Sequence, residues 1–182
     1  MRWPAAYGLL LLCVAGCAPH GQGTAPSKEP RVSPSASSGL PPITIHSHGK
    51  SNEPVRIVEQ QGNKKIYELQ AQSTESSMES QSQFRGTFSK THVTFYGSDG
   101  SNLVGDAPLT TIDKATQRVV MQGGVVGKTN DGMILRCDEL QYNRSTGQLH
   151  GIGNVHIISA QGYSLTGGSF TSDLKLTHVH MQ

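Results

Sequence analysis

Aromatic and charged residues are scarce in this sequence. Aromatics make up 5% of the 182 residues, charged residues 15%, and all hydrophobic residues together 35%, so any hydrophobic core is thin. The formal net charge of +2 is too small to indicate a nucleic-acid partner. No segment shows the 3.6-residue apolar period of an amphipathic helix, which argues against a helical bundle. Glycine is abundant instead, at 21 residues, as is typical of many short strands joined by tight turns.

The sequence also has no evident catalytic trio or metal-ligand cluster. His46 and His48 lie in a segment rich in Pro and Ser, and His178 and His180 alternate in an expected last strand over 174–180. This spacing puts both rings on one face of a strand, as metal sites can use, but third and fourth ligands are not evident. We therefore expect no metal, no cofactor and no enzymatic activity.

Four aspartates recur with the repeat described below: Asp99, Asp106, Asp131 and Asp138. Paired carboxylates could serve a glycosidase, but their recurrence favours turn chemistry, in which an Asp before Gly hydrogen-bonds its own backbone. Several basic side chains either contact lipid phosphates or are solvent-exposed charges dispersed over the surface, and we favour the second interpretation. They are Lys64, Lys65, Lys128, Arg136 and Arg144.

The N-terminus reads as an export signal. Arg2 supplies a positive start, and the apolar run 9–14 is too short to span a bilayer. Val14-Ala15-Gly16-Cys17 resembles the lipobox of bacterial lipoproteins. The resemblance implies a signal peptide over 1–16 and an acylated Cys17 that anchors the mature chain in a membrane. The alternative is an ordinary export signal with a chance cysteine.

If Cys17 is acylated, the mature chain keeps Cys137 alone, so no intramolecular disulfide can form. Cys137 falls in an apolar strand pattern and lacks an evident activating partner, so we expect a small core residue and not a nucleophile. Residues 17–54 are rich in Pro, Ser and Gly and predict a flexible tether. The folded domain is expected over 55–182.

That domain carries an internal repeat. Segment 114–140 aligns with 144–170 at a shift of thirty residues without a gap, and an earlier copy aligns at a shift of thirty-two. Matched positions include Thr116 with Thr146, Gly123 with Gly153, Val125 with Val155, Gly132 with Gly162 and Leu135 with Leu165. Repeats of this period are typical of stacked or extended architectures.

Each unit predicts two strands and two turns. The segment 129–132 predicts a hairpin turn in which Gly132 takes φ > 0, and 143–146 leads into the next unit. The inward residues change parity between Cys137 and Leu140, which predicts a bulge or corner at 138–139. The fold is therefore an all-β, antiparallel stack of hairpins, either a long two-sheet sandwich or an open roll.

The alternation of apolar residues predicts which side chains face inward. Glycines interrupt the inward series at Gly123, Gly127, Gly151 and Gly153, and a sheet pair with many inward glycines either closes or leaves a slot wide enough for acyl chains. The expected inward residues, which would line such a groove, are Val93, Phe95, Leu103, Val119, Met121, Val125, Leu135, Cys137, Leu140, Tyr142, Leu149, Val155, Ile157, Leu165 and Phe170.

Four stretches in this order and spacing resemble the LptC family of lipopolysaccharide-export proteins, which is related to the LptA/OstA repeat. They are YELQA (67–71), VTFYGSDGSNLVGDAPLTTID (93–113), VVMQGGVVGKTNDGMILRCDELQYN (119–143) and GIGNVHIISAQGYSLTGGSFTSDLKL (151–176). The resemblance covers residues 55–182. It implies a twisted, V-shaped, open β-jelly-roll whose interior holds the acyl chains of lipid A.

The resemblance also implies partners. Such domains dock end to end by strand addition with an LptA-like periplasmic protein, and an inner-membrane ABC transporter pushes lipopolysaccharide along the resulting bridge. Typical members have an N-terminal transmembrane helix, whereas this chain has the lipobox. Ala18 follows Cys17 in place of the Asp that retains lipoproteins at the inner membrane in some bacteria, so the anchoring membrane stays open. Two other functions stay open as well: a structural envelope lipoprotein that binds a protein without conducting lipid, and a diffusing carrier of one lipid.

Overall fold

The computed structural model describes residues 43–50, 53–78, 80 and 83–182, and these belong to one compact unit that spans residues 39–182. The expected signal peptide, Cys17 and the first part of the tether lie outside the described residues. Within the described part of the chain, no helix is long and apolar enough to cross a membrane.

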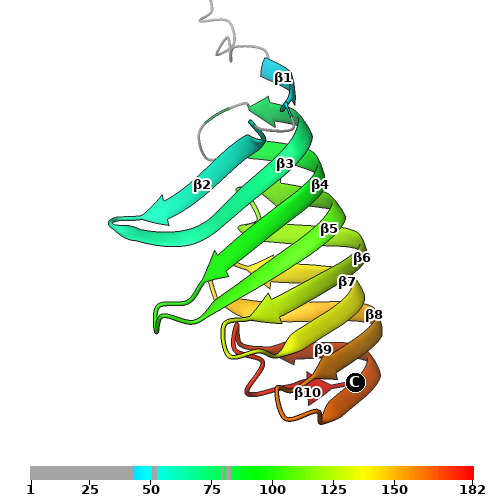
Figure 1. Ribbon diagram of the computed structural model, residues 1–182. Coiled ribbons are helices and arrows are strands. Elements are labelled where there is room, and N and C mark those ends of the chain that lie inside the picture. The colour runs from blue at the N-terminus through cyan, green and yellow to red at the C-terminus, as the bar shows by residue number, and fades with distance from the viewer. Residues whose placement is uncertain (1–42, 51–52, 79, 81–82) are drawn as a thin grey trace, which may run out of the picture. The chain divides into compact units, whose positions relative to one another are not determined.

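The described residues form one antiparallel sheet of ten strands (Figure 1). The strands are β1 (Ile43–His48), β2 (Val55–Gln61), β3 (Lys64–Met78), β4 (Phe84–Tyr96), β5 (Asn102–Asp113), β6 (Arg118–Thr129), β7 (Ile134–Asn143), β8 (Gln148–Ile158), β9 (Ser164–Ser172) and β10 (His180–Met181). From β3 to β10 each strand pairs with the next along the chain. At the other edge, β1 pairs with the C-terminal part of β3 and β2 with its N-terminal part.

Several strands contain a bulge near the middle, which bends them. The residues on both sides of the bulge still face inward. In β7, Leu135 and Cys137 are buried before the bend, and Leu140 and Tyr142 are buried after it. The pairing register with β8 shifts at the same place, which confirms the bulge predicted at 138–139. Bulges bend strands and increase their twist.

Similar shifts occur between β5 and β6, between β6 and β7, and between β8 and β9. Gly123 and Gly153 lie at two of them, with φ of 92° and 74°. These two glycines interrupt the inward series, as predicted, but they are not buried. They lie at the bulges, where a residue without Cβ adopts positive φ at little cost.

The row of bulges divides the sheet into two half-sheets. Half-sheet A comprises the strand portions next to the turns at 62–63, 97–101, 130–133 and 159–163, and we call these turns rim A. Half-sheet B comprises the opposite portions, and its rim B consists of the turns at 114–117 and 144–147 and the chain after Ser172. The half-sheets face each other. Phe95 of β4 in half-sheet A packs on Tyr142 of β7 in half-sheet B with ring centroids 4.6 Å apart, although these strands are not neighbours.

The turns of rim A confirm the repeat and its hairpins. Gly100, Gly132 and Gly162 occupy equivalent turn positions and adopt φ of 82°, 92° and 87°. On rim B, Gln117 has φ of 54° where the next copy has Gly147 at 69°. Backbone geometry is therefore kept between copies even where the residue type is not.

Two boundaries differ from the predicted ones. The sheet begins with Ile43 and not with residue 55, because Ile43 and Ile45 alternate with polar residues and pair with β3 inside the segment expected to be a tether. The expected last strand over 174–180 is wrong as well. Only His180 and Met181 form a strand, because the chain after Ser172 turns away from β9.

Candidate functional site

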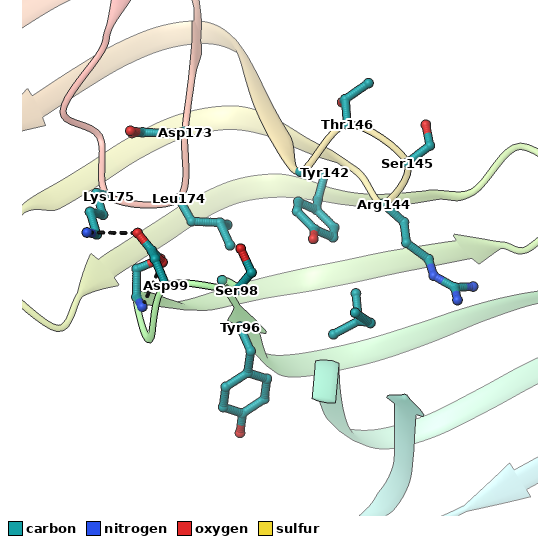
Figure 2. Close-up of a pocket in the computed structure, with 14 residues that line it drawn as sticks. Tyr96, Ser98, Asp99, Tyr142, Arg144, Ser145, Thr146, Asp173, Leu174 and Lys175 are labelled. Atoms are coloured by element: carbon teal, nitrogen blue, oxygen red, sulfur yellow. Dashed lines mark hydrogen bonds and ion pairs between the residues drawn. The ribbon is translucent and has the colours of Figure 1, made fainter. Parts of the chain in front are cut away.

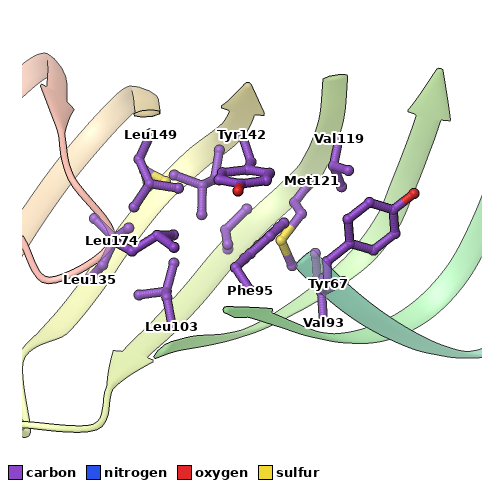
Figure 3. Close-up of a cluster of buried hydrophobic side chains, with 14 of the residues drawn as sticks. Tyr67, Val93, Phe95, Leu103, Val119, Met121, Leu135, Tyr142, Leu149 and Leu174 are labelled. Atoms are coloured by element: carbon purple, nitrogen blue, oxygen red, sulfur yellow. The ribbon is translucent and has the colours of Figure 1, made fainter. Parts of the chain in front are cut away.

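The interior between the half-sheets is the candidate functional site. All of the residues predicted to face inward except Leu165 are buried, and each of them is at most 4% exposed. Figure 3 shows side chains from both half-sheets meeting there, among them Phe95, Leu103, Met121 and Tyr142. Complete burial of one such side chain contributes about 1.5–3 kcal/mol, so this shared interior holds the half-sheets together.

Leu165 is the exception, with 47% of its surface exposed. It pairs with Ile157, which is 1% exposed, and directly opposite residues project on one face of a sheet. Leu165 therefore lies on the inner face as predicted, but its predicted burial is wrong. It sits in the last long strand, and β10 covers only the far end of that strand at Phe170 and Thr171.

Sequence reasoning missed other members of the buried cluster. They are Tyr67, Leu69, Ala71, Phe88, Ala107, Ile112, Leu174 and Leu176. The alternation of Tyr67, Leu69 and Ala71 with polar residues was the available signal for β3. Leu174 and Leu176 lie outside any strand, and only the position of the chain after β9 brings them into the core.

Of the two alternatives for the inward glycines, closure or a slot, the structure has closure. Gly127 and Gly151 are both buried and face inward. The ring of Phe170 lies over Gly151, so that a Cβ placed there would be 2.6 Å from Cδ1 of the ring. At Gly127, the side chains of Leu103 and Leu135 lie 3.5 Å from the position of a Cβ. Neighbouring side chains therefore occupy the space that these glycines leave.

Cys137 is a core residue, as predicted. It is 4% exposed and carries a free thiol. Burial, followed by the charge of Asp138, raises the pKa of this thiol to about 12. A thiol protonated at neutral pH is a poor nucleophile, so the geometry gives Cys137 a packing role.

The histidines and aspartates singled out from the sequence form no metal site in the described part of the chain. Within the described residues, no group of three or more His, Cys, Asp or Glu side chains is placed to hold a metal ion. Asp99 accepts hydrogen bonds from the backbone N–H and the hydroxyl of Ser101, 3.0 and 2.6 Å away, which is the predicted turn chemistry. Asp106 and Asp138 lie near bulges instead. Asp106 pairs with His92 at 2.7 Å, and Asp138 accepts a hydrogen bond from the amide of Asn154 at 2.8 Å.

The apolar inner face continues to both edges of the sheet, where it is exposed. At the β1 edge, Ile43, Ile45 and Met78 are 60%, 45% and 36% exposed. Ile45 pairs with Ser76, which is buried on the inner face, so Ile45 shares that face. At the β9 edge, Leu165 is the exposed continuation of the interior. Neither edge is sealed by charged residues at these positions.

Ion pairs join rim A and half-sheet A to rim B. Glu59 of β2 is 13% exposed, and its two carboxylate oxygens meet Lys114 at 3.1 Å and Arg144 at 2.8 Å. Asp99 in the β4–β5 turn meets Lys175 at 2.8 Å. Burial, followed by the charge of Glu59, raises the pKa of Tyr67 above its usual value of 10.0. These pairs hold the two rims close along one side of the interior, which we call the mouth.

A cavity of about 390 Å³ lies at this mouth (Figure 2). It is lined by residues of both rims and of the chain after Ser172, including Tyr96, Asp99, Tyr142, Arg144, Leu174 and Lys175. A hollow of about 580 Å³ adjoins it, because the two share Ile66, Tyr96, Gly97 and Ser98. Lys64 and Lys65 line this second hollow. Lys65 pairs with Glu68 at 3.1 Å, and Lys64 has no acidic partner among the described residues.

The chain after β9 folds around the carboxylate of Asp173. This carboxylate accepts hydrogen bonds from the backbone N–H of Thr177 at 2.9 Å and from its hydroxyl at 2.6 Å, and it lies 3.3 Å from His178 Nδ1. Burial opposes ionisation, but these hydrogen bonds outweigh it and lower the pKa of Asp173 from 3.8 to about 2. The ionised carboxylate therefore holds this segment in its turn.

Acid is expected to loosen this turn. Because the folded-state pKa of Asp173 is depressed, its contribution to stability is present above pH 3.8 and is lost as the pH falls through about 2. We expect the urea midpoint of the wild-type protein to fall more steeply between pH 4 and pH 2 than that of Asp173→Asn, whose side chain does not titrate there. Parallel curves for the two proteins would show that Asp173 contributes nothing to this pH dependence.

Comparison with known proteins gives a likeness in fold but none in sequence. No family model matches the chain, and no curated protein sequence matches it. The solved structures include a similar fold in LptH of Pseudomonas aeruginosa, described as the LptA-homologous periplasmic component of the lipopolysaccharide transport device. The TM-score is 0.50 and the identity 17%, over 63% of this chain and 80% of LptH. The fold is an LptA-like β-jelly-roll. The predicted all-β, antiparallel, open architecture is thereby confirmed.

Proposed function

We propose that this chain is an LptC-like component of a lipopolysaccharide transport bridge. Its interior would bind the acyl chains of lipid A and pass lipopolysaccharide from an inner-membrane ABC transporter toward the outer membrane. The observation that carries the proposal is the single apolar interior between the half-sheets, which continues to exposed apolar residues at both the β1 and the β9 edges. An apolar path that stops at neither edge is suited to continue into a neighbouring domain.

The sheet edges support docking by strand addition to an LptA-like periplasmic protein. At one edge, β1 and β2 each pair with β3 and with no other strand in the described part of the chain. At the other, residues 164–167 of β9 pair with β8 alone among the described residues. Exposed edge strands invite pairing with another chain, and strand addition is a common mode of recognition. The likeness in fold to LptH also supports this proposal.

The proposed location is the periplasm, with a lipid at Cys17 as the membrane anchor and the following Pro- and Ser-rich segment as a tether. The family resemblance favours the inner membrane, and Ala18 leaves the outer membrane as the alternative. Acyl chains on Cys17 would hold the protein firmly, since each buried CH₂ contributes ~0.8 kcal/mol.

A second function is favoured by the filled interior. Phe170 and its neighbours occupy the space beside the inward glycines, as expected of a structural envelope lipoprotein that binds another protein without conducting lipid. In the bridge hypothesis, acyl chains must instead displace or part these side chains. The two hypotheses therefore differ in what touches the inward residues in cells.

Site-specific photo-crosslinking in the full-length protein separates them. The inward positions are Val125, Leu135 and Val155, and each of the first two has an outward-facing neighbour as its control. Val126 is 46% exposed beside Val125, which is 1% exposed, and Arg136 is exposed beside buried Leu135. The bridge hypothesis predicts lipopolysaccharide adducts at the inward positions and none at Val126 or Arg136. Adducts to protein alone would support the structural lipoprotein.

A further inference from the structure

We propose that the C-terminal segment 173–179 is a displaceable plug, and that the space filled by Leu174 and Leu176 is a subsite for an acyl chain. This inference rests on the proposed function, since it concerns how an apolar ligand enters the interior. The ligand class is an amphiphile with a saturated acyl chain and an anionic head group.

The position of the segment at the mouth is the first observation. Its leucines belong to the buried core, with Leu174 6% and Leu176 2% exposed. Figure 3 shows Leu174 beside Leu103, Leu135 and Leu149, which come from both half-sheets. The segment thus inserts two aliphatic side chains between the half-sheets from the side where the rims meet.

The weak attachment of the segment is the second observation. Among the described residues, no backbone hydrogen bond joins 173–179 to a strand. The backbone bond within it runs from Leu176 N–H to Asp173 O over 3.2 Å. Leu176 has φ of 56°, in the left-handed region that a bulky side chain rarely adopts. Besides its leucines and the half-buried Val179, which packs against the core, the segment is tied to the opposite rim by the pair of Lys175 and Asp99, whose side chains are 42% and 52% exposed. Exposed pairs of this kind contribute little and are screened by salt.

The chemistry of the mouth is the third observation. An acyl chain presents the same aliphatic surface as leucine, so exchanging one for the other keeps the interior filled. The cavity of about 390 Å³ against Leu174 and the adjoining hollow of about 580 Å³ give room for an amphiphile outside the core. Lys64, which lines the hollow and has no acidic partner among the described residues, offers a cation to an anionic head group. The head group would then sit at the rims while the chain takes the place of the leucines.

The charge variants weaken the plug without touching the core. In Lys175→Asp, two carboxylates replace the ion pair, and the double variant Asp99→Lys/Lys175→Asp restores a pair of reversed sign. Lys128→Asp is the matched control, because it changes the net charge equally at an exposed site on β6 that lines neither the cavity nor the hollow. The probe is dansyl-undecanoic acid, a single-chain anionic amphiphile, titrated against the full-length protein and followed by its fluorescence.

Lys175→Asp is expected to speed hydrogen exchange at the amides of 174–178 by about 2- to 5-fold relative to the wild type without probe, which is the size of effect that exposed ion pairs have. The double variant and Lys128→Asp should exchange like the wild type. Leu176→Ser, which removes one plugging side chain, should bind the probe tenfold or more tightly than the wild type. Saturating probe should also speed hydrogen exchange at the amides of 174–178 in the wild type, since the segment must leave.

Two results would overturn the proposal, and only the second would also refute the proposed function. Wild-type hydrogen exchange in Lys175→Asp together with wild-type affinity in Leu176→Ser, with measurable binding by all proteins, refutes the plug and leaves the proposed function intact. No binding of the probe or of lipopolysaccharide by any of these proteins removes the proposed function and the plug together. Circular dichroism spectra that match the wild type establish that each variant is folded.

Discussion

Phe95→Ala is expected to lower the free energy of unfolding by about 3–5 kcal/mol, the usual loss when a buried phenylalanine is truncated. Phe95 is fully buried, and its ring packs on that of Tyr142 with centroids 4.6 Å apart and an interplanar angle of 43°. This contact joins half-sheet A to half-sheet B. Domains of this size are stable by only about 5–15 kcal/mol, so the variant should lose a large fraction of its stability. Urea denaturation followed by circular dichroism measures the change.

The matched control is Tyr163→Ala, which truncates an aromatic residue that is 79% exposed and should change stability by no more than about 0.5 kcal/mol. A double-mutant cycle with Tyr142→Ala should give a coupling of about 0.5–1.5 kcal/mol for the ring pair. A loss below about 1 kcal/mol in Phe95→Ala would contradict the packed interior. It would mean that the half-sheets stand apart in solution and leave an open groove.

Much of the fold could be predicted because its causes are local. The alternation of apolar residues fixed which side chains face inward, and the parity change between Cys137 and Leu140 located a bulge that the pairing register confirms. The turn glycines, such as Gly132 with φ of 92°, could be placed because hairpin turns require positive φ. In each case the residues of one short stretch are enough to determine the local structure that this stretch adopts.

The features that were missed depend on residues that meet only in the folded chain. Glu59 joins two cations from separate turns, and nothing in the sequence near Glu59 indicates either. Strand β1 forms because β3 offers it a partner, although its surroundings are rich in Pro and Ser. Leu174 and Leu176 follow no strand period, and their burial depends on where the chain emerges from β9. Local sequence patterns thus determine the regular part of the domain, whereas contacts between residues far apart in the sequence close its mouth.

Gly151→Ala is expected to lower the free energy of unfolding by about 1–3 kcal/mol, the usual penalty for overpacking a filled core. A Cβ at this position would lie 2.6 Å from Cδ1 of Phe170, a ring that is itself fully buried and has little room to move. Gly127→Ala is the matched control, because it is also a buried strand glycine but its Cβ would meet Leu103 and Leu135 at 3.5 Å. That variant should be neutral or more stable by about 0.4–1 kcal/mol, since alanine restricts the unfolded chain.

A second substitution tests the cause. Phe170→Leu removes the ring that a Cβ at residue 151 would meet, so the double variant Gly151→Ala/Phe170→Leu should be more stable than the sum of the two single changes predicts. Equal tolerance of alanine at Gly151 and Gly127 would instead place the ring of Phe170 away from Gly151. The inner face would then keep an unfilled strip along β8, and acyl chains could enter there without displacing any side chain. The stability of Gly151→Ala therefore decides whether a ligand must compete with the protein's own core.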